Sequence, residues 1–305
     1  MSELLQSKDV QSALAKVRIV LVAPAGPLNV GSVARVMKNF GLSQLYLVDP
    51  QCDPLGTEAL QMAVHADDVL RAAQIVATIP QALVSCEYAI ATTARIRGFE
   101  ADLDLPEIAL PHLLTSETTA KKRPRHTALI FGPEDRGLSN QELTYAQQFL
   151  KIPTSDTYSA LNLAQAVTIC CYELSRVIRD FFSTPSQTHF TTDSTQENKI
   201  PSLQNTPSSD KQSESYLSSP ARVQPIERYE DKPRANLEEI ERYCEHLESL
   251  LLEVGYLLPH TSASRMRKLR QLLHRASPTS HEVALLRGMI RQTEWALSHS
   301  KQRQT

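Results

Sequence analysis

Three short polar stretches in this 305-residue chain combine residue types that could bind a ligand and act on it. The first, P-L-N-V-G-S-V-A-R at residues 27–35, has Asn29, Gly31 and Ser32 at a helix start, where free main-chain amides can hold an anion, and Arg35 further along. The second, F-G-P-E-D-R-G-L-S at residues 131–139, has glycines on both sides of two acids and an arginine. The third, I-P-T-S-D-T-Y-S-A-L-N-L-A-Q-A at residues 152–166, leads from a polar loop into a helix. Each alone is also typical of an ordinary turn or helix cap.

Each polar stretch follows an apolar run that predicts a β-strand. The predicted strands are Val17–Ala23, Leu45–Asp49, Tyr88–Thr92, Thr127–Phe131 and Phe149–Ile152. Because these runs are almost continuously apolar, they suit a parallel sheet covered on both faces. The predicted helices are Val30–Phe40, capped by Asn29 and ended by Gly41, Glu58–Val76, Ser139–Gln148 and Leu161–Phe182. The fold class is therefore α/β, in which ligands bind at the carboxyl ends of the strands.

The composition changes sharply after Phe182. Residues 183–225 are rich in Ser, Thr, Gln and Pro and poor in aliphatic residues, so they cannot bury enough apolar surface to offset chain entropy. We therefore expect a disordered linker there. It would separate an N-terminal domain over residues 1–182 from a C-terminal domain over residues 226–305.

The C-terminal part has the apolar periodicity of a small helical domain. A first helix is predicted over Asn236–Gly255 and a second over Ser262–Arg275. Thr279 and Glu282 form a capping-box pattern for a third, whose apolar residues are Leu285, Leu286, Met289 and Ile290.

Positive charge gathers in the same part of the chain. From Pro259 to the end there are nine Lys or Arg and two Glu, a balance of 9 − 2 = +7. This balance favours an anionic partner such as RNA, although a solvated helix face would also account for it. The candidate RNA-binding residues are Arg265, Arg267, Lys268 and Arg270.

The overall composition excludes several classes of protein. Hydrophobic residues make up 41% of the chain, charged residues 22% and aromatic residues 6%, and the net charge is −2, which disfavours an aromatic-rich RNA platform and a globally basic protein. The five cysteines form no C-x-x-C pair or zinc pattern, so we expect free thiols and no metal. We see no signal peptide and no apolar run near the ~18 residues that span a membrane, and we expect a cytoplasmic protein without a membrane partner.

The order of the three stretches is far more specific than any one of them. N-V-G-S-V-A-R, then F-G-P-E-x-x-G-L, then Y-S-A-L-N-L-A resembles motifs one to three of the TrmH-like branch of the SPOUT RNA methyltransferases. Within that branch the chain resembles the TrmJ type, which methylates the ribose 2′-oxygen of cytidine or uridine 32 in tRNA. The similarity covers roughly residues 17–180, and the helical tail from about residue 233 also resembles that type's C-terminal extension.

The resemblance implies a trefoil knot that binds S-adenosylmethionine, in a homodimer that acts on tRNA. The family's cofactor contacts fall on Thr92, Thr93, Ala94, Gly132, Ile152, Ser159, Ala160 and Leu161. Its functional polar positions fall on Asn29, Arg35, Glu134 and Asn162. Many relatives have Ser-Leu-Asn in motif three, whereas this chain has Ala160-Leu161-Asn162, with the Ser159 hydroxyl one residue away.

The implied reaction is an in-line attack of the ribose 2′-oxygen on the sulfonium methyl group, which needs no metal. A guanidinium rarely gives up its proton, so we expect Arg35 to fix the phosphate and the 2′-oxygen and leave the base unassigned. Glu134 either holds the helix or Arg35 in place or acts as the base itself. The sequence does not decide between cytidine and uridine.

Two other functions remain open from the sequence. A ribosomal RNA 2′-O-methyltransferase would share the same motifs, and a non-catalytic RNA-binding module could keep the fold without turnover. A nicotinamide dehydrogenase is disfavoured because no G-x-G-x-x-G follows the first strand.

Overall fold

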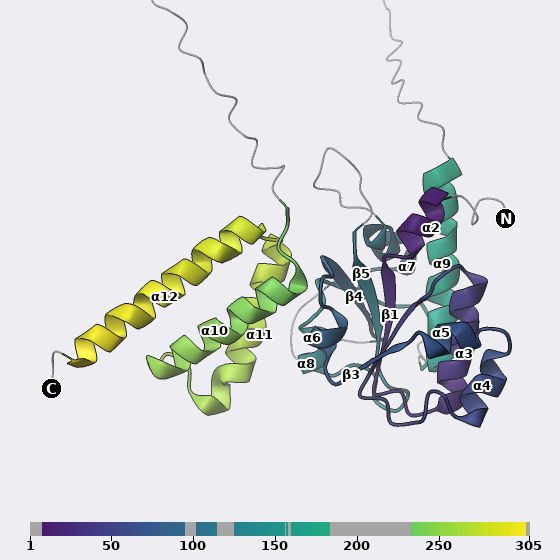
Figure 1. The fold of residues 1–305 in the computed structure, drawn as a ribbon, viewed down its shortest axis with the longest axis horizontal. Coiled ribbons are helices and arrows are strands. Elements are labelled where there is room, and N and C mark those ends of the chain that lie inside the picture. Colours follow the sequence, from purple (N-terminus) through teal and green to yellow (C-terminus); the bar gives the residue numbers. More distant parts are fainter. Residues whose placement is uncertain are drawn as a thin grey trace, which may run out of the picture.

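The computed structural model describes residues 8–94, 102–114, 125–155, 157, 160–183 and 233–302. Residues 8–183, which we call the sheet unit, build a six-stranded parallel sheet in the order β3-β2-β1-β5-β4-β6 (Figure 1). The strands are β1 (Val17–Val22), β2 (Gln44–Val48), β3 (Gln74–Val76), β4 (Tyr88–Thr92), β5 (Thr127–Phe131) and β6 (Gln148–Leu150). The predicted α/β class and its parallel sheet are confirmed.

Alternate residues along the central strands face opposite layers of helices, as the twofold period of a strand requires. Ile19 and Leu21 of β1 pack in one core, and Val20 and Val22 pack in the other. The first core is covered by α2 (Lys8–Leu14), α3 (Pro27–Asn39), α4 (Thr57–Ala63), α5 (Asp67–Arg71), α7 (Pro106–Ala109), the 3-10 helix η1 (Leu110–Leu113) and α9 (Leu163–Ser183). The second is covered by α6 (Ile79–Ala82) and α8 (Asn140–Leu143).

The predicted helix over Glu58–Val76 is wrong. Its residues instead form α4, α5 and the edge strand β3, which pairs with β2. Val64 ends α4 with a φ of 56°, a left-handed conformation that breaks the helical hydrogen-bond ladder. The alanine-rich sequence hid this break because alanine favours a helix wherever packing leaves the choice open.

Two other helix boundaries also differ from the prediction. The helix expected over Ser139–Gln148 is the single turn α8, capped by Ser139, because Gln148 belongs to β6. Asn29 is not the cap of α3, since Pro27 starts this helix and Gly26 is its cap. A proline at the first position costs nothing because its missing N–H would have no helical partner. Gly41 ends α3 with a φ of 76°, as predicted.

Residues 233–302, which we call the helical unit, form three helices: α10 (Leu237–Glu253), α11 (Pro259–Ala276) and α12 (Ser280–Gln302). Hydrogen bonds between Thr279 and Glu282 in both directions confirm the predicted capping box. Leu286 and Ile290 of α12 pack in the core of this unit, whereas Leu285 and Met289 are 52% and 59% exposed. Only half of the predicted apolar set of α12 therefore faces the other two helices.

The helical unit is packed against the sheet unit. The Leu237 amide donates to the Cys86 carbonyl (2.9 Å), and the Leu237 side chain is buried in the second core of the sheet unit. Gln147, directly before β6, contacts Nδ1 of His274 on α11 (2.9 Å). His274 lines two cavities of about 200 and 220 Å³ at this junction. None of the motif residues Asn29, Glu134 and Asn162 lines either cavity.

The predicted linker over residues 183–225 lies outside the described residues, apart from Ser183 at the end of α9. All five cysteines are free. Within the described ranges no group of three or more His, Cys, Asp and Glu side chains is arranged to hold a metal ion. Over the same ranges no helix is both long and apolar enough to cross a membrane.

Candidate active site

A chain of three polar side chains joins the three motifs at the carboxyl edge of the sheet. The Glu134 carboxylate accepts hydrogen bonds from Nδ2 of Asn29 (2.7 Å) and from the amides of Ala25 (3.1 Å) and Gly26 (3.2 Å). Oδ1 of Asn29 accepts in turn from Nδ2 of Asn162 (2.9 Å). Asn29 lies more than 100 positions from both Glu134 and Asn162 in sequence, so this network is made by the fold and not by local turn chemistry.

Asn162 also caps the long helix α9. Its Oδ1 accepts from the amides of Ala164 (2.9 Å) and Gln165 (3.3 Å), and its own amide donates to Oε1 of Gln165 (3.3 Å). This is a reciprocal capping arrangement, which fixes the direction of the Asn162 side chain. Gln165 thus supports the network, and its position three residues after Asn162 was the sequence signal that could have identified it.

Glu134 is held in its ionised form. Partial burial alone would raise the pKa of this carboxyl, but the hydrogen bonds from Asn29, Ala25 and Gly26 outweigh burial and lower it. A carboxylate with a lowered pKa is a weak proton acceptor. The anion beside the start of α3 is therefore the Glu134 carboxylate. The sequence had suggested that an anionic ligand could bind at this place.

Arg35 stands apart from this network. It lies on α3 six residues after Asn29, and six helical steps of ~100° turn it to another face of the helix. Its side chain is exposed, and it forms no hydrogen bond or ion pair with any residue that the structure describes. Arg35 shares its face with Leu28, one heptad earlier, which is 48% exposed.

Gly31 and Ser32 lie inside α3, which begins at Pro27, and not at its start. A Cβ atom at Gly31 would lie 2.2 Å from the Ala59 carbonyl oxygen, so this glycine allows α3 and α4 to pack closely. The reason for a glycine here is helix packing and not access of a ligand to a free amide.

The second motif forms a tight loop that leaves no space for a side chain at Gly132, its second residue. A Cβ atom at Gly132 would lie 2.3 Å from the Leu138 amide nitrogen and 2.4 Å from the Gly137 carbonyl carbon. Gly137 has a φ of 67°, and its amide donates to the Pro133 carbonyl (2.9 Å). The loop therefore presents main-chain atoms, and it directs Glu134 toward α3.

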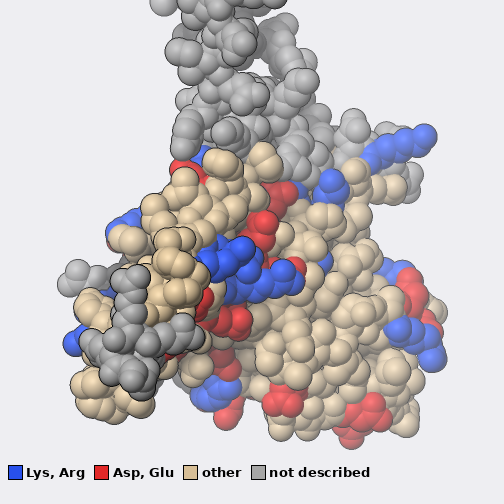
Figure 2. All heavy atoms as spheres, turned by 60° about the vertical axis from the view of Figure 1, so that its left-hand side comes forward, with Lys and Arg blue, Asp and Glu red and all other residues tan. Residues whose placement is uncertain are grey.

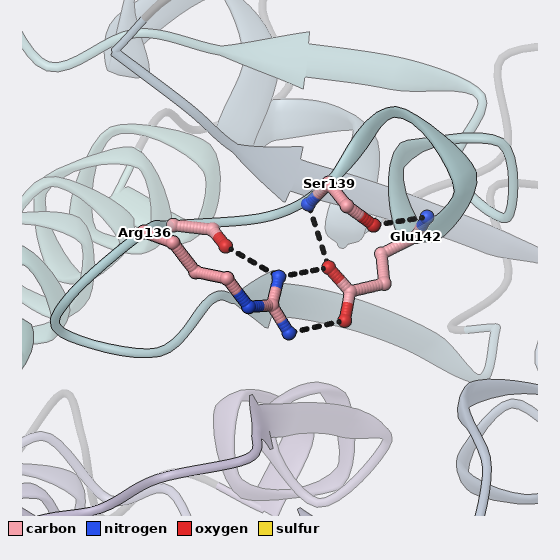
Figure 3. A network of polar contacts seen from close by, with 4 residues as sticks. Arg136, Ser139 and Glu142 are labelled. Carbon is pink, nitrogen blue, oxygen red and sulfur yellow. Dashed lines mark hydrogen bonds and ion pairs between the residues drawn. The ribbon is translucent and has the colours of Figure 1, made fainter.

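An ion pair closes the outer side of this loop (Figure 3). Arg136 binds Glu142 with two hydrogen bonds of 2.8 and 2.9 Å, and Glu142 also accepts from the Ser139 amide (2.6 Å). The Ser139 hydroxyl caps α8 by accepting from the Glu142 amide. Sequence reasoning noted the arginine of this stretch but did not pair it with Glu142. The signal was available, because Ser139 and Glu142 are spaced as a capping box.

The predicted cofactor residues gather at the ends of three neighbouring strands. Thr92, Thr93 and Ala94 follow β4, Gly132 follows β5 and Ile152 follows β6, and β4 lies between the other two. The Thr93 amide donates to the Leu150 carbonyl (2.9 Å), which joins the ends of β4 and β6. Ala160 and Leu161 lie in the loop before α9, and Ser159 lies outside the described residues. The cramped loop at Gly132 and the half-buried Thr92 and Thr93 fit a nucleoside ligand that is bound largely through main-chain atoms.

The predicted RNA-binding residues divide into two groups. Arg265 and Lys268 are exposed and Arg267 is half-buried, all on α11. Arg270 instead points inward and forms a two-hydrogen-bond ion pair with Glu241 of α10 (2.8 and 3.0 Å), in which both side chains are 13% exposed. Its assignment to an RNA surface is corrected, because this charge is already neutralised within the helical unit.

Acidic residues accompany the basic ones on the same face of the molecule. Figure 2 shows Lys and Arg next to Asp and Glu along the middle of this face, with uncharged surface on either side. Helix α10 carries six Glu and one Arg, whereas α11 carries five Lys or Arg and no acid. The positive balance of the C-terminal part is therefore concentrated on one helix.

Comparisons with known proteins identify the family of this chain. The model of the SpoU rRNA methylase family matches residues 16–172, and that of the tRNA methyltransferase TrmJ C-terminal domain matches residues 238–304. The tRNA (cytidine/uridine-2′-O-)-methyltransferase TrmJ of Klebsiella pneumoniae is 33% identical over 92% of this chain and 97% of its own length. The tRNA (cytidine/uridine/adenosine-2′-O-)-methyltransferase TrmJ of Pseudomonas aeruginosa is 32% identical over 92% and 95%.

A solved structure leads to the same conclusion. The crystal structure of TrmJ from Z. mobilis ZM4 is 29% identical, has a TM-score of 0.68, and covers 92% of this chain and 100% of its own. A sheet unit and a helical unit thus occur together in both proteins. This chain belongs to the SpoU methylase family, in its TrmJ branch.

Proposed function

We propose that this protein transfers a methyl group from S-adenosylmethionine to the ribose 2′-oxygen of tRNA, at cytidine or uridine 32 of the anticodon loop. The observation that supports this most directly is the hydrogen-bonded chain Glu134–Asn29–Asn162, which links all three motifs beside the strand ends. The names of the TrmJ relatives support tRNA and the 2′-oxygen. The identity of the accepted nucleotide is a separate question, since one relative is also named for adenosine.

The cofactor would be held at the ends of β4, β5 and β6. Thr92, Gly132 and Ile152 would line the adenosine side, and the loop at Ala160 and Leu161 would close over it. Once bound, the cofactor supplies an electrophilic methyl group on a positively charged sulfur. The protein's own task is then to hold the ribose hydroxyl about 3–3.5 Å from that carbon, in line with the breaking bond.

Each polar residue has a defined part in that task. Glu134 keeps the start of α3 and Asn29 in place, and its lowered pKa argues against a role as the general base. Asn29 and Asn162 hold the three motifs together beside the place where the ribose would bind. Arg35 binds the phosphate and stabilises charge on the 2′-oxygen, and the proton acceptor remains unassigned.

We also propose a homodimer formed through α3 and α9. Leu28 on α3 and Tyr172 on α9 are each 48% exposed, and the Tyr172 ring packs edge-on against Phe40 at a centroid distance of 6.4 Å. Figure 1 shows the two helices side by side on the outside of the sheet unit. Arg35 lies on the same side as Leu28, so a dimer of this kind would bring Arg35 against the other protomer. Sedimentation of the wild type and of Tyr172→Glu, at equal concentration, tests the assembly.

The domain boundaries and the trefoil knot complete the proposal. Residues 1–182 would form the methyltransferase domain, 183–225 a flexible linker, and 226–305 an RNA-binding extension. The knot is supported by the path of the chain, which leaves β6 on the far side of β4 and returns to pack α9 against α3. The contact of Asn162 with Asn29 lies on this return path.

Mapping of ribose methylation by mass spectrometry tests the function directly. tRNA and ribosomal RNA from cells with and without the gene should differ only at nucleotide 32 of some tRNAs. Loss of a ribosomal methyl group instead would support the ribosomal alternative. If both RNAs were unchanged and the purified protein bound tRNA without turnover, the protein would be a binding module.

A further inference from the structure

Helix α11 carries an exposed stripe that contains three positive charges. Arg265, Lys268, Leu272 and Arg275 follow one another at intervals of three or four residues, and all four side chains are exposed. At a rise of 1.5 Å per residue this stripe is about 15 Å long. No acidic residue belongs to α11, and the buried Met266 and His274 lie on the opposite side of the helix.

The stripe begins beside an exposed aromatic ring. Tyr256 lies in the turn between α10 and α11 and is 62% exposed, whereas its neighbour Leu257 is 1% exposed and anchors the turn in the core of the helical unit. Gly255 provides the turn with a φ of 76° and has open space at its Cβ position. The backbone of Tyr256 is therefore held in place, while its ring is open to solvent.

Arg265 connects the ring to the stripe. Its guanidinium carbon lies 5.6 Å from the centroid of the Tyr256 ring, and its Nη1 donates to the Tyr256 carbonyl (3.0 Å). The cation is thereby held against the ring, and Lys268 lies one turn further along the helix. Among the described residues Lys268 and Arg275 have no ion-pair partner.

We propose that Tyr256 and Arg265 form a stacking site for an unpaired base of the RNA substrate, while Lys268 and Arg275 bind the phosphates next to it. This inference rests on the proposed function and names the part of the RNA that the helical unit would recognise. Aromatic rings stack on any base whose face is open, which occurs in loops and single strands and not inside a helix. A stripe of cations without acids is complementary to the phosphate chain of such a loop.

The unit contains a matched control. Trp295 on α12 is also an exposed aromatic residue, at 56%, but its ring stacks on His299 of the same helix at 4.2 Å. It lies on a different helix from the stripe. Removal of this ring should leave RNA affinity unchanged.

Stacking and charge can be separated by the salt dependence of binding. We would measure the Kd of full-length protein for a tRNA anticodon stem-loop at several salt concentrations. Tyr256→Ala should weaken binding at least ~5-fold with an unchanged salt slope, because stacking releases no counterions. Tyr256→Phe should bind like the wild type, and Trp295→Ala likewise. Lys268→Ala should weaken binding and reduce the slope of log K against log salt by about 0.7–0.9.

The outcomes distinguish this inference from the proposed function. Wild-type protein that methylates and binds tRNA, with no loss in Tyr256→Ala, would overturn the stacking site alone. An equal loss in Tyr256→Phe, or a changed slope in Tyr256→Ala, would also overturn it. Wild-type protein that neither binds nor methylates tRNA would overturn both. Thermal unfolding of each variant shows whether a loss of binding reflects a loss of folding, and Tyr256→Leu provides a second variant without the ring.

Discussion

At the scale of single residues, the members of the polar network differ from Arg35. The network residues position the site, whereas Arg35 is free to contact a substrate. Glu134, Asn29 and Asn162 form hydrogen bonds with one another and with backbone amides. Arg35 has no described partner, so its guanidinium is available for a phosphate and an oxygen at once. Because Arg35 forms no hydrogen bond or ion pair that stabilises the described structure, it is the best candidate among these residues for direct contact with RNA.

Arg35→Lys should lower the methylation rate at least ~100-fold, since a lysine keeps the charge but loses the planar fork of donors. Affinity for S-adenosylmethionine should barely change, because the predicted cofactor residues follow β4, β5 and β6 and not α3. Single-turnover methylation measures the first effect and calorimetry the second. Arg71→Lys, at an exposed arginine on α5, is the matched control. Near-normal turnover by Arg35→Lys would leave α3 with only a structural role.

Glu134→Gln tests the positioning role. Glutamine keeps one acceptor oxygen but loses the charge that three donors share. The loop that holds both Glu134 and the predicted cofactor residue Gly132 should therefore loosen from the start of α3, and cofactor affinity should fall along with the rate. A general base would behave differently, because its loss lowers the rate while binding stays intact. Calorimetry and a pH–rate profile of the same preparation separate the two. A rate loss of ~100-fold with unchanged binding would favour the base.

The convergence of these residues was predictable, but some of their contacts were not. Each motif follows a strand of a parallel sheet, so the sequence already placed Asn29, Glu134 and the loop before α9 at one edge. The inward turn of Arg270 depends on how α10 and α11 pack, since Glu241 lies 29 residues away. The sequence showed only a basic run. No local pattern distinguishes the buried charge from the exposed ones.

At the scale of elements, the strands were predicted best and the short helices worst. β4 and β5 have the predicted bounds, because continuous apolar runs between polar turns leave few alternatives. β3 was missed because it has three residues and its pairing with β2 supplies the stability that its own sequence lacks. Such an edge strand depends on pairing with its neighbour, so it is difficult to predict from its own sequence.

Gly132→Ala should disrupt the second motif loop. Its new Cβ atom would meet backbone atoms at 2.3–2.4 Å, which no side-chain rotation relieves, so we expect a loss of at least about 1–3 kcal/mol of stability and a loss of cofactor binding. Gly288→Ala in α12 is the control, since its Cβ position is open and alanine should stabilise that helix by about 0.5–1 kcal/mol. Urea unfolding and calorimetry measure both. Unchanged cofactor binding by Gly132→Ala would show that the loop can move.

His274 makes the contact between α11 and the sheet unit sensitive to acid. Oε1 of Gln147 accepts from the Ala89 amide (2.7 Å), so its Nε2 must donate to Nδ1 of His274, which has to be neutral there. Burial lowers the pKa of His274 to about 4 from 6.5. As the pH falls below about 6.5 the unfolded chain takes up this proton first, so stability decreases down to about pH 4, by about 2 kcal/mol at pH 5.

Urea unfolding of the wild type and of His274→Gln at pH 7.5 and pH 5 tests this contact. The wild type should lose about 2 kcal/mol more than the variant between the two pH values. His260→Gln, at an exposed histidine of α11, should keep the wild-type dependence. Identical pH dependence in wild type and His274→Gln would mean that the contact opens before the chain unfolds.

At the scale of the whole molecule, the two units have separate proposed tasks, and Leu237 of the helical unit belongs to a hydrophobic core of the sheet unit. The candidate active site belongs entirely to the sheet unit, and the charged stripe belongs to α11. Leu237 nevertheless completes the second core of the sheet unit at 4% exposure. RNA contacts proposed for α11 would thus be fixed relative to the sheet, which would give the helical unit a way to set the position of a tRNA against the strand ends.

Removal of residues 226–305 should therefore have three distinct effects. S-adenosylmethionine should still bind, since the predicted cofactor positions all precede residue 183, and stability should fall by at least the roughly 1.5–3 kcal/mol gained by burying one leucine. tRNA should bind more weakly and with a flatter salt dependence, because fewer phosphates are neutralised. Calorimetry with cofactor, urea unfolding, and tRNA binding at several salt concentrations measure these effects on fragment 1–225. Equal tRNA affinity with the same salt slope would make the helical unit a structural brace, and a folded fragment that fails to bind the cofactor would overturn the placement of that site at β4, β5 and β6.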